Sequence, residues 1–238
     1  MIIQQNQKNY LLLITIIFLI FITNFLIGLY FQESTNGIVW VGDDATHISL
    51  ANSFRDNGNF FYDFYTGRET DYSVDEIINL YPDDIERPLI IKGPIFYTLL
   101  GTIYEIFDVS VENESFVAEL LNSFLISIFL TLLLFLLRRI FDLKIALISI
   151  SIAIAIPFIG LNSARVFLYP LLFVFSICAF YFSQKKSSHY LLFGFFVGLS
   201  HLTHPFGIYL GASYLVFLLL NKEFKGFLQV GLVWHIML

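Results

Sequence analysis

The sequence predicts an all-α fold, a polytopic transmembrane helical bundle with a large exterior first loop that contains an amphipathic interfacial helix. Composition is the first reason for this prediction. Of the 238 residues, 57% are hydrophobic and only 13% are charged, whereas soluble domains average about 45–50% apolar and about 25% charged residues. The second reason is the alternation of long apolar segments with short charged ones. The third is an uneven distribution of Lys and Arg among the connecting loops, which is typical of membrane proteins.

The first apolar segment is long enough to cross a bilayer. Residues 10–31 contain no charged side chain, and a helix of this length, at about 1.5 Å per residue, exceeds a hydrocarbon core of about 30 Å. A signal peptide would have a shorter apolar region of about 7–15 residues, followed by small residues at the cleavage site. The residues from Gly28 to Phe31 are a poor cleavage site. We therefore expect an uncleaved helix.

Residues 32–115 are predicted to form the exterior loop, with a short helix near its start. Asp43 or Asp44 is a good N-cap for this helix, and Asn57-Gly58 is a good stop. Between them, apolar residues recur every three positions, which is typical of a helix lying on a bilayer surface. Later in the loop, residues 95–107 are apolar but too short to span, so we expect an interfacial or re-entrant segment.

Residues 116–238 are predicted to contain the further spans. The apolar segments are 116–137, 145–162, 166–183, 191–203, 206–220 and 227–238. The last of these is too short to complete a span. We therefore expect a truncated chain, in which residues 1–238 are the N-terminal part of a longer multi-span membrane domain.

Counts of Lys and Arg in the short loops predict the orientation. One set of loops carries eight basic residues and should be cytoplasmic: Lys8, Arg138, Arg139, Lys144, Lys185, Lys186, Lys222 and Lys225. The N-terminus is then cytoplasmic. Four residues with polar or charged side chains fall together on the exterior side: Asp43, Lys92, Arg165 and His204.

Charge and cysteine content exclude several classes of function. The net charge is −6, and residues 33–119 carry seventeen acidic residues against four basic ones. A basic surface for nucleic acid is therefore absent from the pattern, and no nucleic-acid partner is expected. The single cysteine, Cys178, lies in an apolar segment, which indicates neither a disulfide framework nor a cysteine-based metal site.

Short motifs occur in a particular order along the chain. They are Asp43-Asp44 after the first span, Arg87-Pro88, Lys92-Gly93-Pro94, Arg138-Arg139 after the second span, and the run from Gly198 to Gly207, which reads GLSHLTHPFG. In this order they resemble the GT-C fold glycosyltransferases, among them the lipid A aminoarabinose transferase and the protein O-mannosyltransferases. The resemblance covers essentially the whole chain, as the N-terminal half of such a protein.

The resemblance implies roles for individual residues. Asp43, Asp44 and His47 match an Asp-Glu-x-x-Tyr-like motif whose Asp is catalytic, with Asp in place of Glu and His in place of Tyr. Lys92 matches the Lys of a Lys-Pro-Pro motif that helps to hold a lipid phosphate. His204 stands where a Leu-Thr-Arg/Lys-Pro motif has its basic residue.

The function implied is a membrane glycosyltransferase of a cell envelope, in the plasma membrane of a prokaryote. It would transfer a sugar from a polyprenyl-phosphate-linked donor to a lipid, glycan or protein acceptor on the exterior face. The catalytic candidates are Asp43 and Asp44, with Asp43 as the general base. Fixed cations near the departing phosphate would lower the barrier. The substrate-binding candidates are Lys92, Arg165, His204, His47 and Arg87.

Other interpretations remain open. Each acidic candidate could simply cap the helix, Arg165 could snorkel at a helix end, and Lys92 could pair with a loop carboxylate. No cofactor is required for the chemistry. A divalent metal is a further alternative, since Asp43 and His47, four positions apart, and His201 and His204, three positions apart, could each share a helical face. The alternative functions are a non-enzymatic multi-span transporter or scaffold, and an inactive glycosyltransferase relative.

Overall fold

The computed structural model describes residues 15–16, 18–23, 25–27, 30, 43–58, 94–156, 166–183 and 189–237. This part of the chain contains helices and no strand, which confirms the all-α class. The helices are α2 (Asp43–Asn57), α4 (Ile95–Ile106), α5 (Glu114–Ile140), α6 (Leu143–Ala155), α8 (Tyr169–Ser183), α9 (Tyr190–Thr203), α10 (Gly207–Leu220) and α11 (Phe224–Met237). A single 3₁₀ turn, Val111–Asn113, precedes α5.

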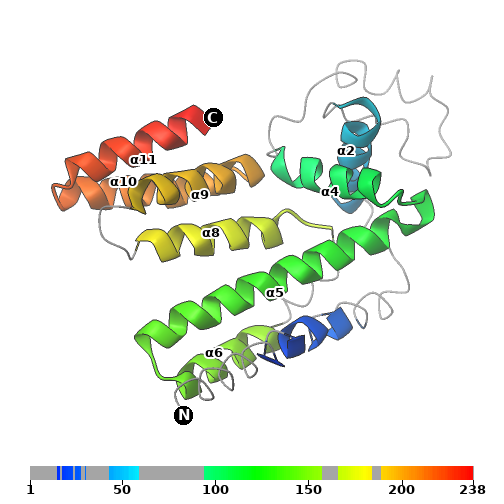
Figure 1. The fold of residues 1–238 in the computed structure, drawn as a ribbon, viewed down its shortest axis with the longest axis horizontal. Coiled ribbons are helices and arrows are strands. Elements are labelled where there is room, and N and C mark those ends of the chain that lie inside the picture. Colours follow the sequence, from blue (N-terminus) through cyan, green and yellow to red (C-terminus); the bar gives the residue numbers. More distant parts are fainter. Residues whose placement is uncertain are drawn as a thin grey trace, which may run out of the picture.

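The long helices lie side by side, and the two helices α2 and α4 gather at one end of them (Figure 1). Contacts run in sequence through the bundle, from α6 to α5, from α5 to α8, and from α8 to α9, which in turn packs on α10 and α11. The starts of α5 and α8 and the turn between α9 and α10 all lie at the end occupied by α2 and α4 (Figure 1). Chain segments far apart in sequence therefore meet there.

Helix α5 is the part of the described chain that best fits a membrane span. Together with the preceding 3₁₀ turn it runs over Val111–Ile140, and among the described residues it is the one helix long and apolar enough to cross a membrane. Arg138 and Arg139 lie in its last turn, where they interact favourably with the helix dipole. The predicted segment 116–137 is thus helical throughout. The multi-span topology and the exterior placement of the first loop stay predictions.

Helix α6 is shorter than the predicted segment 145–162. The Asp142 side chain caps its start, accepting a hydrogen bond from the Ile145 backbone N–H at 2.9 Å. The helix ends at Ala155, and Ile156 is extended with φ −72° and ψ 122°. Pro157 follows, and a residue before proline is disfavoured in the helical conformation. Apolar character therefore continues beyond the point where the helix stops.

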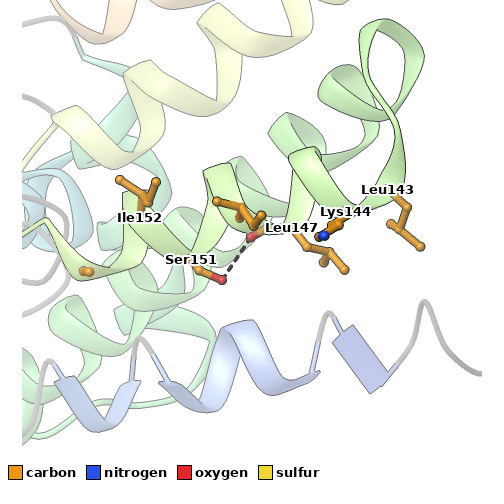
Figure 2. Close-up of a pocket in the computed structure, with 7 residues that line it drawn as sticks. Leu143, Lys144, Leu147, Ser151 and Ile152 are labelled. Carbon is orange, nitrogen blue, oxygen red and sulfur yellow. Dashed lines mark hydrogen bonds between the residues drawn. The ribbon is translucent and has the colours of Figure 1, made fainter.

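One face of α6 lines a groove of about 730 Å³ (Figure 2). The residues that line it are Leu143, Lys144, Leu147, Ile148, Ser151, Ile152 and Ala155. Among the lining residues only Ser151 has a hydroxyl, and this hydroxyl already donates a hydrogen bond to the Leu147 carbonyl oxygen at 2.9 Å. Apart from Lys144 and Ser151, the lining is apolar. Helix α6 lies away from α2 and α4 (Figure 1).

Helix α2 packs on α4, at the place where the sequence predicts a short helix. It ends at Asn57, and Gly58 takes the left-handed conformation (φ +65°) expected after a helix C-terminus. The buried face of α2 carries His47, Leu50 and Ala51. That the helix lies on a bilayer surface stays a prediction, whereas its packing against α4 is a feature of the fold.

A hydrophobic core joins α2, α4, α5 and the start of α8. Its buried members are Leu50, Ala51, Phe96, Tyr97, Leu100, Tyr104, Ala118, Leu125, Val166, Leu168 and Leu171. The predicted segment 166–183 begins inside this core, although its helix starts only at Tyr169. The core therefore fixes the mutual position of the elements on which the predicted site residues occur.

Candidate functional site

A series of ring contacts connects His47 to His204, two residues predicted from the sequence to bind substrate. The His47 ring contacts Phe167 edge-on, with ring centres 6.5 Å apart. Phe167 contacts Tyr169 at 5.9 Å, and Tyr169 contacts His204 at 5.3 Å. The structure thus brings α2, the segment before α8 and the α9–α10 turn together.

His47 is held in the contact between α2 and α4. Its side chain is 2% exposed, and its Nδ1 atom shares a hydrogen bond of 3.1 Å with the Tyr97 hydroxyl. The two rings are also stacked, with centres 5.6 Å apart. Buried polar groups persist when they are hydrogen-bonded. His47 lies four residues after Asp43 on the same helix, so the two positions share a face.

His204 is part of the turn between α9 and α10. Its backbone is extended (φ −156°, ψ 140°), and its Nδ1 atom accepts a hydrogen bond from the Phe206 backbone N–H at 3.2 Å. His201, one turn earlier, accepts from the Trp234 indole N–H at 3.2 Å. A neutral imidazole that accepts at Nδ1 carries its proton at Nε2, so these contacts do not favour a metal held jointly by the two rings. The described residues contain no cluster of three metal-binding side chains.

Of the remaining predicted site residues, the structure describes the backbone of Asp43 and Asp44 only. Helix α2 begins at Asp43 and includes Asp44, at the end of a helix where the dipole favours negative charge. Arg87, Lys92 and Arg165 lie outside the described residues.

Lys92 and Arg165 have described neighbours in sequence, Pro94 and Val166, and both neighbours lie near the core that joins α2, α4 and α5. Pro94 precedes α4, on which Phe96 and Tyr97 contact the His47 ring. Val166, the residue after Arg165, is buried in the core that joins α2, α4 and α5.

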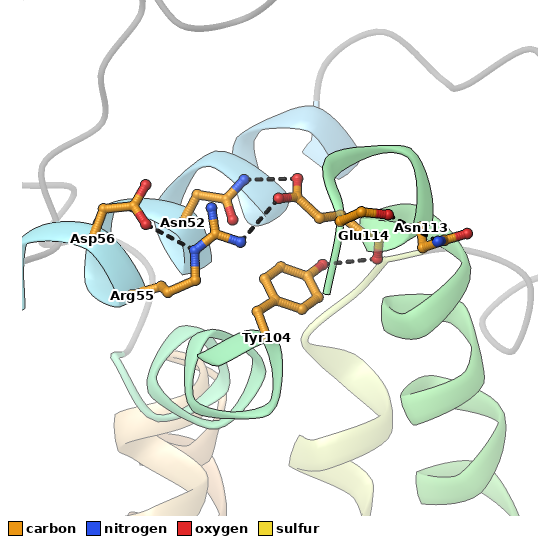
Figure 3. Close-up of polar contacts among 7 residues, drawn as sticks. Asn52, Arg55, Asp56, Tyr104, Asn113 and Glu114 are labelled. Carbon is orange, nitrogen blue, oxygen red and sulfur yellow. Dashed lines mark hydrogen bonds and ion pairs between the residues drawn. The ribbon is translucent and has the colours of Figure 1, made fainter. Parts of the chain in front are cut away.

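A buried carboxylate that sequence reasoning missed lies at the first residue of α5 (Figure 3). Glu114 accepts a hydrogen bond from the Asn52 side-chain amide at 2.8 Å and one from the Arg55 guanidinium at 3.1 Å. Its backbone carbonyl accepts from the Tyr104 hydroxyl at 2.8 Å. One residue therefore joins α2, α4 and α5. The sequence does place this carboxylate at the start of a long apolar segment. A charge at a membrane boundary needs a partner, so its position could have indicated a buried contact.

The charges around Arg55 reinforce one another. The hydrogen bond from Arg55 to Asp56, at 2.8 Å, raises the pKa of the guanidinium, and the contact with Glu114 raises it further against the effect of burial. Burial also raises the pKa of the Tyr104 hydroxyl, and the nearby Glu114 charge adds to that effect. Tyr104 is therefore a neutral donor, and Arg55 a permanent cation.

A second groove lies between the end of α4 and the start of α5. Its volume is about 730 Å³. Its lining is mainly apolar, with Phe107, Phe116 and Phe124 among others, and the polar residues that line it are Asp108, Ser110 and Asn113. The groove is separate from the series of rings that links His47 to His204.

The described residues form a helical bundle with one helix of membrane-spanning length, which fits an integral membrane protein, and imidazole, aromatic and carboxylate side chains lie together around α2 and the starts of α5 and α8. The model of one protein family, dolichyl-phosphate-mannose-protein mannosyltransferase, matches residues 91–238. The chain belongs to this family, which is of the GT-C glycosyltransferase type and consists of integral membrane proteins. No curated protein and no solved structure matches the chain.

Proposed function

We propose that this membrane glycosyltransferase uses a sugar donor carried on a polyprenyl phosphate and acts on the exterior face of the membrane. The family's name specifies mannose on dolichyl phosphate as donor and a protein as acceptor. For this chain, the proposal extends to a lipid-phosphate-linked sugar and to a lipid, glycan or protein acceptor.

The observation that carries the proposal is the series of rings from His47 through Phe167 and Tyr169 to His204. It gathers at one end of the bundle three segments that contain or adjoin the predicted site residues. Asp43 opens the helix that carries His47, and Arg165 is joined directly to the segment that carries Phe167. This arrangement supports the proposal that the Asp43 carboxylate and the Arg165 guanidinium act in one region.

In the proposed reaction, the Asp43 carboxylate takes the proton of an acceptor hydroxyl as its oxygen attacks the anomeric carbon. The new carbon–oxygen bond forms as the bond from the anomeric carbon to the phosphate oxygen breaks. The electron pair of the broken bond stays on the phosphate, whose added negative charge is stabilised by Lys92 and Arg165. Arg can contact a phosphate in a bidentate manner. The proposed site also includes Asp44 as the second catalytic candidate. Its further substrate-binding residues are Arg87, His47 and His204.

The experiment is an assay of sugar transfer from a radiolabelled polyprenyl-phosphate donor by the full-length protein carrying Asp43→Asn. Loss of a general base is expected to slow transfer by about 10²–10⁴-fold. The matched control is Asp56→Asn, because Asp56 is another carboxylate of α2 and its side chain is 55% exposed. Transfer by Asp43→Asn at nearly the unsubstituted rate would refute the proposed role of Asp43.

A further inference from the structure

Glu114 connects the start of the membrane-length helix to two side chains of α2. Both of its carboxylate oxygens are used, Oε2 by Asn52 and Oε1 by Arg55. The Glu114 side chain is only 5% exposed. The carboxylate is therefore buried at the point where α2 and α5 approach each other (Figure 3).

The two carboxylates that contact Arg55 differ in their surroundings. Asp56 is 55% exposed and Glu114 is 5% exposed. Exposed ion pairs contribute little, because water screens them. Removing one member of a buried pair leaves the other charge without compensation, which is strongly destabilising. The contact with Asp56 lies within α2, whereas the contact with Glu114 joins Arg55 to α5.

Among the described residues, side-chain hydrogen bonds attach both halves of α2 to neighbouring helices. His47, in its first half, is held to α4 through Tyr97. Asn52 and Arg55, in its second half, are held to α5 through Glu114. Two attachments to two different helices restrict both the tilt of a helix and its rotation about its own axis. Without the attachment to Glu114, the contact between His47 and Tyr97 would still hold the first half of α2 to α4, but α2 could rotate about that contact and carry Asp43 to a different position relative to α5.

We propose that Glu114 is a positioning residue for sugar transfer, which holds α2, and with it Asp43, in a fixed place relative to α5. This inference rests on the proposed role of Asp43. Displacing a reacting group by about 1 Å can slow a reaction by about 10²-fold. Asp43 acts in the transition state, so its displacement lowers kcat and leaves KM for the lipid-linked donor unchanged.

The test compares Glu114→Ala with Asp56→Asn in the full-length protein, and both substitutions remove one carboxylate partner of Arg55. Hydrogen–deuterium exchange is followed in peptides from α2, with peptides from α9 as an internal reference. For Glu114→Ala we expect faster exchange in α2, unchanged exchange in α9, and a kcat per folded molecule lowered about tenfold or more. Helix α4 stays joined to α5, because Tyr104 donates to the backbone carbonyl of residue 114. For Asp56→Asn we expect neither change.

A charge exchange provides the rescue. In the double variant Arg55→Glu with Glu114→Arg, the ion pair is restored in the opposite sense. The Asn52 Oδ1 atom is buried and has no hydrogen-bond partner among the described residues, so it is available to accept from the introduced guanidinium. We expect the double variant to recover exchange protection in α2 and most of the lost kcat.

Three results would overturn the inference. Unchanged exchange in α2 of Glu114→Ala would show that Glu114 does not hold this helix. Faster exchange with unchanged kcat would show that the position of α2 does not govern transfer, and a raised KM with unchanged kcat would place Glu114 in donor binding instead. The exchange measurement does not depend on Asp43. It therefore separates a failure of this inference from a failure of the proposed catalytic role, which Asp43→Asn tests on its own.

Discussion

A Cβ atom added at Gly101 would stand 2.5 Å from the backbone carbonyl oxygen of Ala51. The two helices α2 and α4 cross here with no room for a methyl group, and the obstacle is main chain that cannot rotate away. This close approach allows Leu50 and Ala51 to be buried against Leu100. The close packing of α2 on α4 therefore requires glycine at position 101.

The first prediction is that Gly101→Ala destabilises the protein despite improving helix propensity. Forcing extra volume into a packed contact costs about 1–3 kcal/mol, against a gain of about 1 kcal/mol for replacing Gly within a helix. We expect a lower midpoint of thermal unfolding, measured in detergent by tryptophan fluorescence, and faster proteolysis within α2.

The control for this prediction is Gly231→Ala in α11. A Cβ at Gly231 would meet nothing within 4 Å, so the propensity gain should appear alone and raise the unfolding midpoint. Equal effects of the two substitutions would show that the crossing of α2 and α4 is looser than its geometry indicates.

Some helix boundaries could be predicted because local chemistry sets them. Pro205 separates two uncharged segments, and a proline inside a helix removes a hydrogen bond and clashes with the preceding turn. Accordingly α9 ends at Thr203 and α10 begins at Gly207, close to the predicted limits. The end of α6 was missed because hydropathy does not register the restriction that Pro157 places on Ile156.

The candidate site could be predicted only in part. His47 and His204 were identified from motifs, but their link through Phe167 and Tyr169 depends on how α8 enters the core. The partners of Glu114 lie 62 and 59 residues away in sequence. No periodicity can reveal such pairs, because they arise only once α2 rests against the start of α5.

The second prediction concerns the Tyr104 hydroxyl, which donates to the Glu114 carbonyl at 2.8 Å. A hydrogen bond of this kind contributes about 0.5–1.5 kcal/mol, so Tyr104→Phe should be less stable by this amount near neutral pH. Burial raises the pKa of Tyr104 above its ordinary value of 10.0 in the folded state. Below about pH 10 the Tyr104 hydroxyl makes its full contribution to the free energy of unfolding. As the pH rises above about 10 this contribution is lost, because the Tyr104 hydroxyl then ionises in the unfolded chain but not in the folded one.

Urea unfolding of the unsubstituted protein and of Tyr104→Phe between pH 7 and pH 11 would measure this difference. We expect the stability gap to narrow above about pH 10, which is the ordinary pKa of tyrosine. Because the other tyrosines are common to both proteins, their titration cancels in the comparison. A gap that widened with pH would contradict the assignment of Tyr104 as a buried neutral donor.

The third prediction tests orientation, which rests on the distribution of Lys and Arg between loops. The side chain of Asp56 on α2 is 55% exposed, and Lys222, in the turn after α10, is also exposed. These two residues belong to opposite sides of the predicted topology. In a background carrying Cys178→Ala, which removes the single native thiol, Asp56→Cys should react with a membrane-impermeant maleimide added to intact cells. Lys222→Cys should react only after lysis, and the reverse pattern would place α2 and the proposed site on the cytoplasmic face.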